Sequence, residues 1–302
     1  MRRLLAALLG MVLLTSCSAG RDDDRPRVVV GAGSTTEQRV LAALTVLTLA
    51  RAGLRAEVRD DLGGTVGLRR EALAGGVDVF WDYTGAAWAL GMGRQAPPSD
   101  PQASFERVRT ADEDRGLTWL RPSSANATLA LFVRTDDLPA DERPNGLGWL
   151  GRQLGRSGRR LCADPDFIRR PGGLESLAAG YGMQLQRVNQ TAVPARENEA
   201  IAEVAEGRCF AALATATSGR ARRAGLVLVA DHRAVFPAFI VSPVARTDRL
   251  EQEAELAAAL DPLAQVLDTE RLAALNARAE TGEDPRDIAR DFLDDVLPRA
   301  RQ

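Results

Sequence analysis

The segment Gly76–Trp88 (GVDVFWDYTGAAW) constrains the fold of this chain more than any other part of the sequence. It opens with an apolar run that favours a buried strand, and the run ends at the aromatic and acidic residues 81–83. Thr84 and Gly85 follow at once and begin an alanine-rich stretch that favours a helix. An aromatic side chain beside the unpaired N–H groups of a helix start suits a small ligand with a cationic head and a carboxylate tail. The segment therefore predicts an α/β fold with a ligand site near Tyr83 and Thr84.

Two further strand-to-helix turns precede this one. An apolar run at 28–30 leads through a glycine-containing turn to Thr35, whose hydroxyl is placed to begin a helix. A second strand, predicted at 54–58, leads through Asp61–Thr65 into another helix. Because the carboxyl ends of parallel strands meet at one edge of a sheet, all three turns are expected to face the same ligand. The GAG sequence at 31–33 lacks the third glycine of a dinucleotide-binding motif.

Residues 1–17 have the pattern of a bacterial lipoprotein signal. Arg2 and Arg3 precede an apolar run that is too short to span a bilayer, and small residues stand directly before Cys17. Cys17 is therefore predicted to carry the lipid that anchors the protein to the outer face of the cell membrane. The charged stretch 18–27 is predicted to be a solvated tether.

Charge and composition limit the remaining chain. About 280 residues follow the signal, which is enough for two lobes of ordinary domain size. The net charge is −2, so the chain has no electrostatic footprint for nucleic acid. The single histidine, His232, and the lack of metal-binding motifs give little support to an enzyme or to any metal or cofactor.

Cys162 and Cys209 remain once Cys17 is assigned to the lipid. An oxidising compartment permits a disulfide between them. Both lie in predicted parallel strands, but at different distances from the strand ends, and this offset places them beyond bridging distance. Two buried thiols are the expectation.

The chain is predicted to divide into two lobes. Lobe 1 is expected to contain residues 28–122 and 235–302, and lobe 2 residues 123–234. The crossings between them fall near 122–126 and 235–241. Each lobe is predicted to be a mostly parallel sheet flanked by helices, and three amphipathic helices are expected in the C-terminal part, at 250–266, 268–278 and 285–297.

Five segments make the sequence resemble the substrate-binding proteins of ABC importers for glycine betaine, choline, carnitine and related osmoprotectants. They are VVVGAGSTTEQ (28–38), DLGGTVGLRREALAGGVDVFWDYTG (61–85), CADPDF (162–167) with RRPGGLESLAAGYG (169–182), FPAFIVSPVAR (236–246) and LNARAETGEDPRDIARDFL (275–293). The resemblance implies a two-lobed periplasmic-binding-protein fold of type II. It also implies that the ligand is trapped between the lobes and handed to a membrane permease with a cytoplasmic ATPase.

The resemblance also implies a set of ligand contacts. In that family a box of aromatic side chains surrounds a quaternary ammonium group, and its positions fall here on Tyr83, Leu129, Thr215 and Phe239. The carboxylate-binding positions fall on Gly33, Ala86 and Arg170, of which only Arg170 keeps the family residue. Asn126, at the first crossing, is a further candidate contact. Thr35 and Thr84, at two of the strand-to-helix turns, are candidates as well.

Two of the four box positions are not aromatic, so the ligand stays open. The favoured ligand is a betaine-like or choline-like solute, and another small amine or zwitterion is the next candidate. Trp81, Trp88 or Phe167 could replace the missing rings, although packing explains both tryptophans well. The alternative function is a ligand-sensing or structural lipoprotein of the same fold.

Overall fold

The computed structural model describes residues 27–95, 97–138, 146–154, 156 and 158–298. The predicted signal peptide with Cys17, and all but the last residue of the tether, lie outside these ranges and stay predictions. Within the described part of the chain, no helix is both long and apolar enough to cross a membrane.

The first sheet has five strands in the order β2-β1-β3-β10-β4. The strands are β1 (Val28–Gly31), β2 (Ala56–Arg59), β3 (Val79–Tyr83), β4 (Leu117–Trp119) and β10 (Val241–Arg246). β1 is parallel to β2 and β3, with Val28 opposite Ala56 and Val30 opposite Val79. Only β10 runs against its neighbours β3 and β4, so the sheet is mostly parallel, as predicted.

Helices cover both faces of this sheet. Alternation along β3 explains why: Trp81 packs toward α1, α13 and α14, and Phe80 packs on the other face toward α2 and α4. The helices are α1 (Thr36–Arg51), α2 (Thr65–Leu73), α3 (Thr84–Ala86), the π-helical turn η1 (Ala87–Gly91), α4 (Pro101–Glu113), α11 (Thr247–Gln252), α12 (Glu255–Val266), α13 (Thr269–Ala279) and α14 (Pro285–Val296). The helix predicted at 250–266 is thus two helices, because the backbone leaves the helical conformation at Glu253.

The second sheet also has five strands, in the order β7-β6-β8-β5-β9. Here β5 alone is antiparallel to its neighbours, so both sheets share one plan. The strands are β5 (Leu129–Arg134), β6 (Leu161–Ala163), β7 (Ala192–Pro194), β8 (Ala211–Thr215) and β9 (Leu226–Val229). The helices are η2 (Thr135–Asp137), α5 (Gly146–Leu154), α6 (Pro165–Arg169), α7 (Leu174–Tyr181), α8 (Leu185–Thr191), α9 (Glu197–Ala205) and α10 (Gly219–Arg223).

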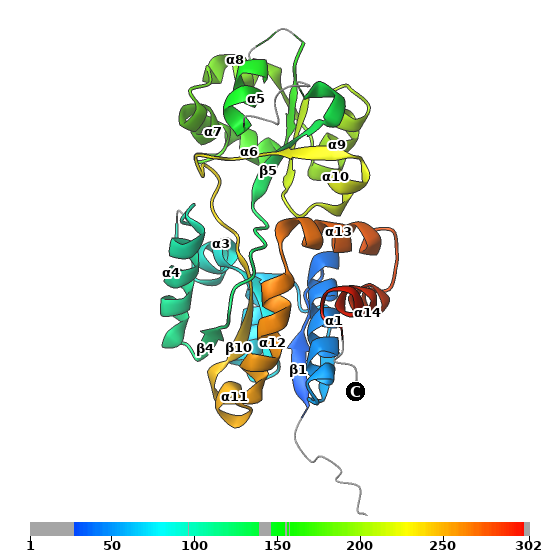
Figure 1. Ribbon diagram of the computed structural model, residues 1–302. Coiled ribbons are helices and arrows are strands. Elements are labelled where there is room, and N and C mark those ends of the chain that lie inside the picture. Colours follow the sequence, from blue (N-terminus) through cyan, green and yellow to red (C-terminus); the bar gives the residue numbers. More distant parts are fainter. Residues whose placement is uncertain (1–26, 96, 139–145, 155, 157, 299–302) are drawn as a thin grey trace, which may run out of the picture.

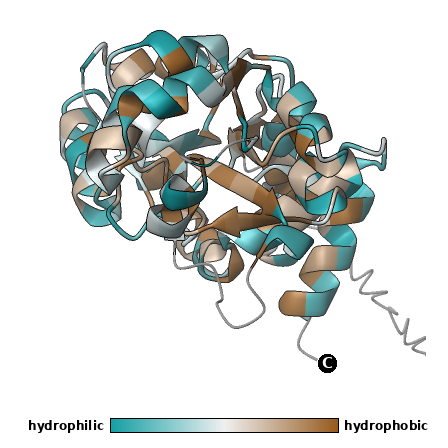
Figure 2. Ribbon diagram, turned by 90° about the horizontal axis from the view of Figure 1, so that it is seen from above, coloured by the Kyte–Doolittle hydropathy of each residue, from teal (hydrophilic) through white to brown (hydrophobic). Residues whose placement is uncertain are grey.

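Two crossing segments join the lobes and run side by side (Figure 1). Asn126 and Ile240 form an antiparallel bridge, and the N–H of Ala127 donates to the carbonyl of Phe239 at 2.9 Å. The strands before and after each segment belong to different sheets. In the view from above, apolar strands lie inside and polar helical faces lie outside (Figure 2). This architecture is the two-lobed periplasmic-binding-protein fold of type II. The exact lobe boundaries, near residues 122 and 235, stay predictions.

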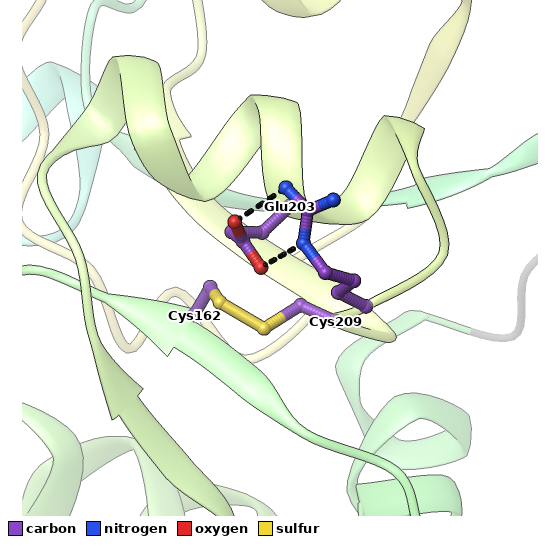
Figure 3. Close-up of a disulfide and its surroundings, with 4 residues drawn as sticks. Cys162, Glu203 and Cys209 are labelled. Atoms are coloured by element: carbon purple, nitrogen blue, oxygen red, sulfur yellow. Dashed lines mark hydrogen bonds and ion pairs between the residues drawn. A yellow bond between two sulfur atoms is a disulfide. The ribbon is translucent and has the colours of Figure 1, made fainter.

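The expectation of two free thiols was wrong, because Cys162 and Cys209 form a disulfide (Figure 3). The prediction placed Cys209 inside a straight strand, but β8 begins only at Ala211. Cys209 lies in the turn that follows α9, and its N–H donates to the carbonyl of Glu203 at 3.0 Å. This turn brings the Cys209 Cα within 6.0 Å of the Cys162 Cα in β6.

Candidate ligand-binding site

A cavity of about 590 Å³ lies between the two lobes, at the carboxyl ends of the strands. β3 and the starts of α1 and α2 contribute to it from lobe 1, and β8 and the start of α9 from lobe 2. Its lining residues are Ser34, Thr35, Thr36, Glu37, Gln38, Gly64, Thr65, Tyr83, Ala86, Ala127, Glu197, Thr215, Thr217, Ser218, Phe239, Asn276 and Glu280. A hollow of about 760 Å³ between α1, α12 and α14 is larger, but none of the predicted contact residues lines it.

Tyr83 forms part of the lobe 1 wall where β3 ends. Its hydroxyl donates to Glu37 Oε1 at 2.7 Å, and Asn276 Nδ2 donates to Glu37 Oε2 at 2.6 Å. Burial, followed by the charge of Glu37, raises the pKa of the Tyr83 hydroxyl well above its usual value. Tyr83 therefore stays neutral, and Glu37 is held in place by two donors.

A buried cluster of charged residues, formed by Asp82, Arg69 and Asp112, holds the backbone of Tyr83. The Asp82 side chain accepts from the Tyr83 N–H at 2.9 Å and from the Thr65 hydroxyl at 2.8 Å, and Thr65 itself lines the cavity. Arg69 lies between Asp82 and Asp112, at 3.3 and 2.5 Å. Burial raises the pKa of Asp82 to about 6, although Arg69 opposes the shift.

Thr215 forms part of the lobe 2 wall where β8 ends. Its N–H and its hydroxyl donate to Glu197 Oε2 at 3.0 and 2.9 Å. Glu197 begins α9, directly after β7, so it reaches the cavity from the same edge of the sheet. The predicted box position Thr215 thus carries no ring and instead holds a carboxylate at the cavity.

Phe239 belongs to the second crossing segment, and two of the predicted contact residues hold its backbone. Asn126 Oδ1 accepts from the Phe239 N–H at 2.8 Å, and the Thr84 hydroxyl accepts from the Ile240 N–H at 3.1 Å. Neither Asn126 nor Thr84 is among the described residues that line the cavity. The Phe239 ring packs on Gly85, where a Cβ atom would lie only 2.5 Å from Phe239 Cε2.

The cavity is acidic. Glu37, Glu197 and Glu280 line it, and among its described lining residues none is Arg, Lys or His. Burial raises the pKa of Glu280, and the charge of Glu197 adds to this shift, while Arg223 and Arg220 oppose it. These carboxylates come from both lobes, so a cation between them favours the closed form.

Arg170 and Leu129 line a separate cavity of about 230 Å³, and among the described residues Glu197 alone lines both cavities. The Arg170 side chain is 47% exposed and lies 3.6 Å from Asp166. The structure therefore does not bring Arg170 together with Tyr83 in one cavity. At Gly33, a Cβ atom would lie 2.0 Å from Gln38 Oε1, so this position has no room for a longer side chain.

The three aromatic residues weighed as substitutes lie outside the first cavity. Trp81 is buried and donates its ring N–H to Thr45, as expected of a core residue. Trp88 donates to the carbonyl of Gln95 at 3.0 Å, and Phe167 lines the second cavity. No group of His, Cys, Asp and Glu side chains in the described residues could hold a metal ion.

Five acidic or amide side chains that line the cavity were not among the predicted contacts: Glu37, Gln38, Glu197, Asn276 and Glu280. Glu37 and Gln38 lie in the first turn of α1, where a role at the helix start explains both residue types without a ligand. A signal for Glu197 existed, because it begins a helix directly after a strand, as Thr84 does. Asn276 and Glu280 lie in and after α13, away from any strand end, and only tertiary packing brings them to the cavity.

Comparisons with known proteins agree with this architecture. A family model described as the substrate-binding domain of ABC-type glycine betaine transport systems matches residues 26–295. A glycine-betaine-binding protein of Pseudomonas aeruginosa is 30% identical over 286 residues, which are 87% of this chain and 86% of that protein. The glycine betaine-binding protein YehZ of Escherichia coli is 28% identical over 290 residues, 94% of each chain.

Solved structures extend the match to three dimensions. The structure of apo YehZ from Escherichia coli has a TM-score of 0.81 and 28% identity, and the match covers 90% of this chain and 99% of that one. A glycine betaine/carnitine/choline ABC transporter structure, at 21% identity, also has a TM-score of 0.81. The matched proteins are named for binding or transport. The family model spans nearly the whole chain, and the chain therefore belongs to the family of substrate-binding domains of ABC-type glycine betaine transport systems.

Proposed function

We propose that this protein captures a small solute with a cationic head, of the quaternary ammonium or small zwitterion type, in the cavity between its lobes. It then delivers the solute to the permease and ATPase of an ABC importer. The observation that carries this proposal is the pairing of the Tyr83 and Phe239 rings with three carboxylates in one interlobe cavity. Aromatic faces and carboxylates both attract cations.

The names of the relatives support the same ligand class. Glycine betaine appears in the names of the Pseudomonas and Escherichia proteins, and carnitine in that of OpuCC from Listeria monocytogenes, which is 26% identical over 310 residues. Both compounds carry a quaternary ammonium group. Tyr83, Phe239, Thr215 and Thr35 line the cavity and are the proposed direct contacts. Asn126 and Thr84 act by holding Phe239 in place.

The proposed location is the outer face of the cell membrane. The pattern that ends at Cys17 supports lipid attachment there, and stretch 18–27 would let the folded part reach the permease. Replacing Cys17 by Ser should release the protein from the membrane fraction. Membrane retention of that variant would contradict the proposed anchor.

Ligand binding is tested with the protein from Ser18 onward, by thermal shift and then calorimetry. The panel contains glycine betaine, choline, carnitine, proline betaine, ergothioneine and a set of amino acids. A compound present at 100 times its dissociation constant should add about 2.7 kcal/mol of stability. A shift with cationic or zwitterionic amines supports the proposal, and no shift with any of them contradicts it. If the purified protein binds a compound but deletion of its gene leaves uptake of that compound unchanged, a sensing role would be favoured instead.

A further inference from the structure

We infer that Glu197 provides the direct contact of lobe 2 with the cationic head of the ligand, in place of the aromatic ring that the family resemblance implied at Thr215. This inference rests on the proposed function, because it assumes that the solute lies in the interlobe cavity. It assigns Thr215 the role of positioning Glu197. The cation is then recognised by a ring from lobe 1, at Tyr83, and by a negative charge from lobe 2.

The first step of the argument concerns how Glu197 is held at the cavity. Glu197 is the first residue of α9 and is half-buried among the lining residues. Its Oε2 accepts from the Thr215 N–H at 3.0 Å and from the Thr215 hydroxyl at 2.9 Å. The start of a helix favours a negative charge, and the two donors fix one oxygen atom. The carboxylate is therefore in place before a ligand arrives, and little ordering remains when the ligand binds.

The second step is that the other oxygen atom of this carboxylate is open. Glu197 Oε1 accepts no hydrogen bond from the described residues, and it is not among their buried side-chain atoms that lack a partner. It is therefore accessible to solvent and to a ligand. Arg170 lines the second cavity together with Glu197, but its ion pair is with Asp166, at 3.6 Å. A cationic ligand can thus reach Glu197 without displacing a basic side chain of the described residues.

The third step compares Glu197 with the other two carboxylates of the cavity. Both oxygen atoms of Glu37 accept hydrogen bonds from neutral side chains. Glu280 lies 4.0 Å from Arg223, an arginine of lobe 2. Among the described residues that line the cavity, Glu197 is thus the carboxylate that combines an open oxygen atom with no basic partner.

The fourth step concerns the chemistry of the cation. A quaternary ammonium group has no N–H to donate, so a carboxylate attracts it by charge alone. An aromatic ring attracts the same cation through the negative face of its π-system. Both contacts need only a positive charge on the ligand. A carboxylate held by Thr215 can therefore take over the role of a ring at that position.

The test uses two pairs of compounds that differ in the charge of the head group. Choline is paired with 3,3-dimethylbutan-1-ol and glycine betaine with 3,3-dimethylbutanoate, since a neutral tert-butyl group then replaces the trimethylammonium group at nearly the same size. Glu197→Gln keeps an acceptor oxygen for Thr215 and removes the charge. In competition calorimetry at pH 7, this variant should lower the preference for the charged head by about tenfold in each pair. An unchanged preference would overturn the inference, whatever the effect on the absolute affinities. If neither choline nor glycine betaine binds the parent protein, the proposed function itself fails.

Thr215→Val tests the positioning role, because valine keeps the size of threonine and removes the hydroxyl that donates to Glu197. It should weaken binding of the quaternary compound by roughly threefold in the parent and have no further effect in Glu197→Gln, since the two side chains act as one unit. An equal loss in both backgrounds would make Thr215 an independent contact and overturn its positioning role.

Glu199→Gln is the matched control, because Glu199 lies in the same helix, is exposed and is not a lining residue of the cavity. It should leave the preference for the charged head unchanged. The same loss of preference in Glu199→Gln as in Glu197→Gln would assign the effect to the net charge of the protein and overturn the inference.

Discussion

At the residue scale, Tyr83 connects the cavity to the charged residues of lobe 1. Its ring lines the cavity and its hydroxyl donates to Glu37. Tyr83→Ala should weaken binding of the best compound by tens-fold, because a desolvated ring contributes about 2 kcal/mol to holding a cation. Tyr83→Phe keeps the ring and should cost much less.

The control for this prediction is the other tyrosine of the chain, Tyr181. Its hydroxyl donates a hydrogen bond to Asp231 within lobe 2, and Tyr181 is not a lining residue of the cavity. Tyr181→Phe should leave the dissociation constant, measured by calorimetry, unchanged. If Tyr83→Ala binds the ligand as tightly as the parent protein, Tyr83 does not contact the ligand.

The raised pKa of Asp82 predicts how the free energy of unfolding changes with pH. Its pKa is raised from 3.8 to about 6 in the folded protein, so between these values the folded state binds more protons than the unfolded state. The free energy of unfolding that Asp82 contributes is therefore highest at low pH and falls as the pH rises from about 4 to about 6. The expected loss is about 3 kcal/mol, at about 1.4 kcal/mol per pKa unit.

Urea unfolding of the parent and of Asp82→Asn across this pH range isolates the effect. The variant stays neutral at every pH, so its stability relative to the parent should rise between about pH 4 and 6 and then level off. A difference that does not change with pH would show that Asp82 keeps an ordinary pKa.

At the element scale, the disulfide ties β6 to the turn between α9 and β8, across a sequence separation of 47 residues. Replacing both cysteines by Ala should lower the free energy of unfolding by roughly 2–4 kcal/mol, because the unfolded chain gains freedom. Denaturant unfolding with and without a thiol reductant provides the control. The reductant should destabilise the parent and leave the double variant unaffected, and equal stability of parent and variant would contradict the prediction.

The sequence predicted the elements best where local chemistry decides them. The three strand-to-helix turns of lobe 1 follow from apolar runs that end at hydroxyl and glycine residues, and the structure has them at Thr35, Thr65 and Thr84. The disulfide was missed because the turn after α9 cannot be derived from strand spacing. Asn276 was missed because α13 reaches the cavity only through packing between the lobes.

At the scale of the whole molecule, the two lobes contact each other through α10 and α13. Asn276 from lobe 1 donates to the Thr217 carbonyl of lobe 2, and Arg223 lies 4.0 Å from Glu280. Gly219 lies against α13 so closely that a Cβ atom would be 2.4 Å from the Ala277 backbone N. Because the contact joins different lobes, we expect it to break when the lobes separate.

Gly219→Ala should therefore act on closure and not on folding. Backbone atoms of α13 cannot move aside cheaply, so the closed form loses free energy and the dissociation constant rises by roughly tenfold. The melting temperature without ligand should stay the same or rise, because alanine favours a helix more than glycine does. Small-angle scattering with saturating ligand should give a larger radius of gyration than for the parent.

Gly148→Ala is the matched control, since its new Cβ in α5 would meet atoms only at 3.8 and 3.9 Å. It should leave affinity and radius of gyration unchanged. If Gly219→Ala binds as tightly as the parent and closes as fully, the packing of α10 on α13 does not limit closure. Ligand contacts in the cavity would then hold the two lobes together by themselves.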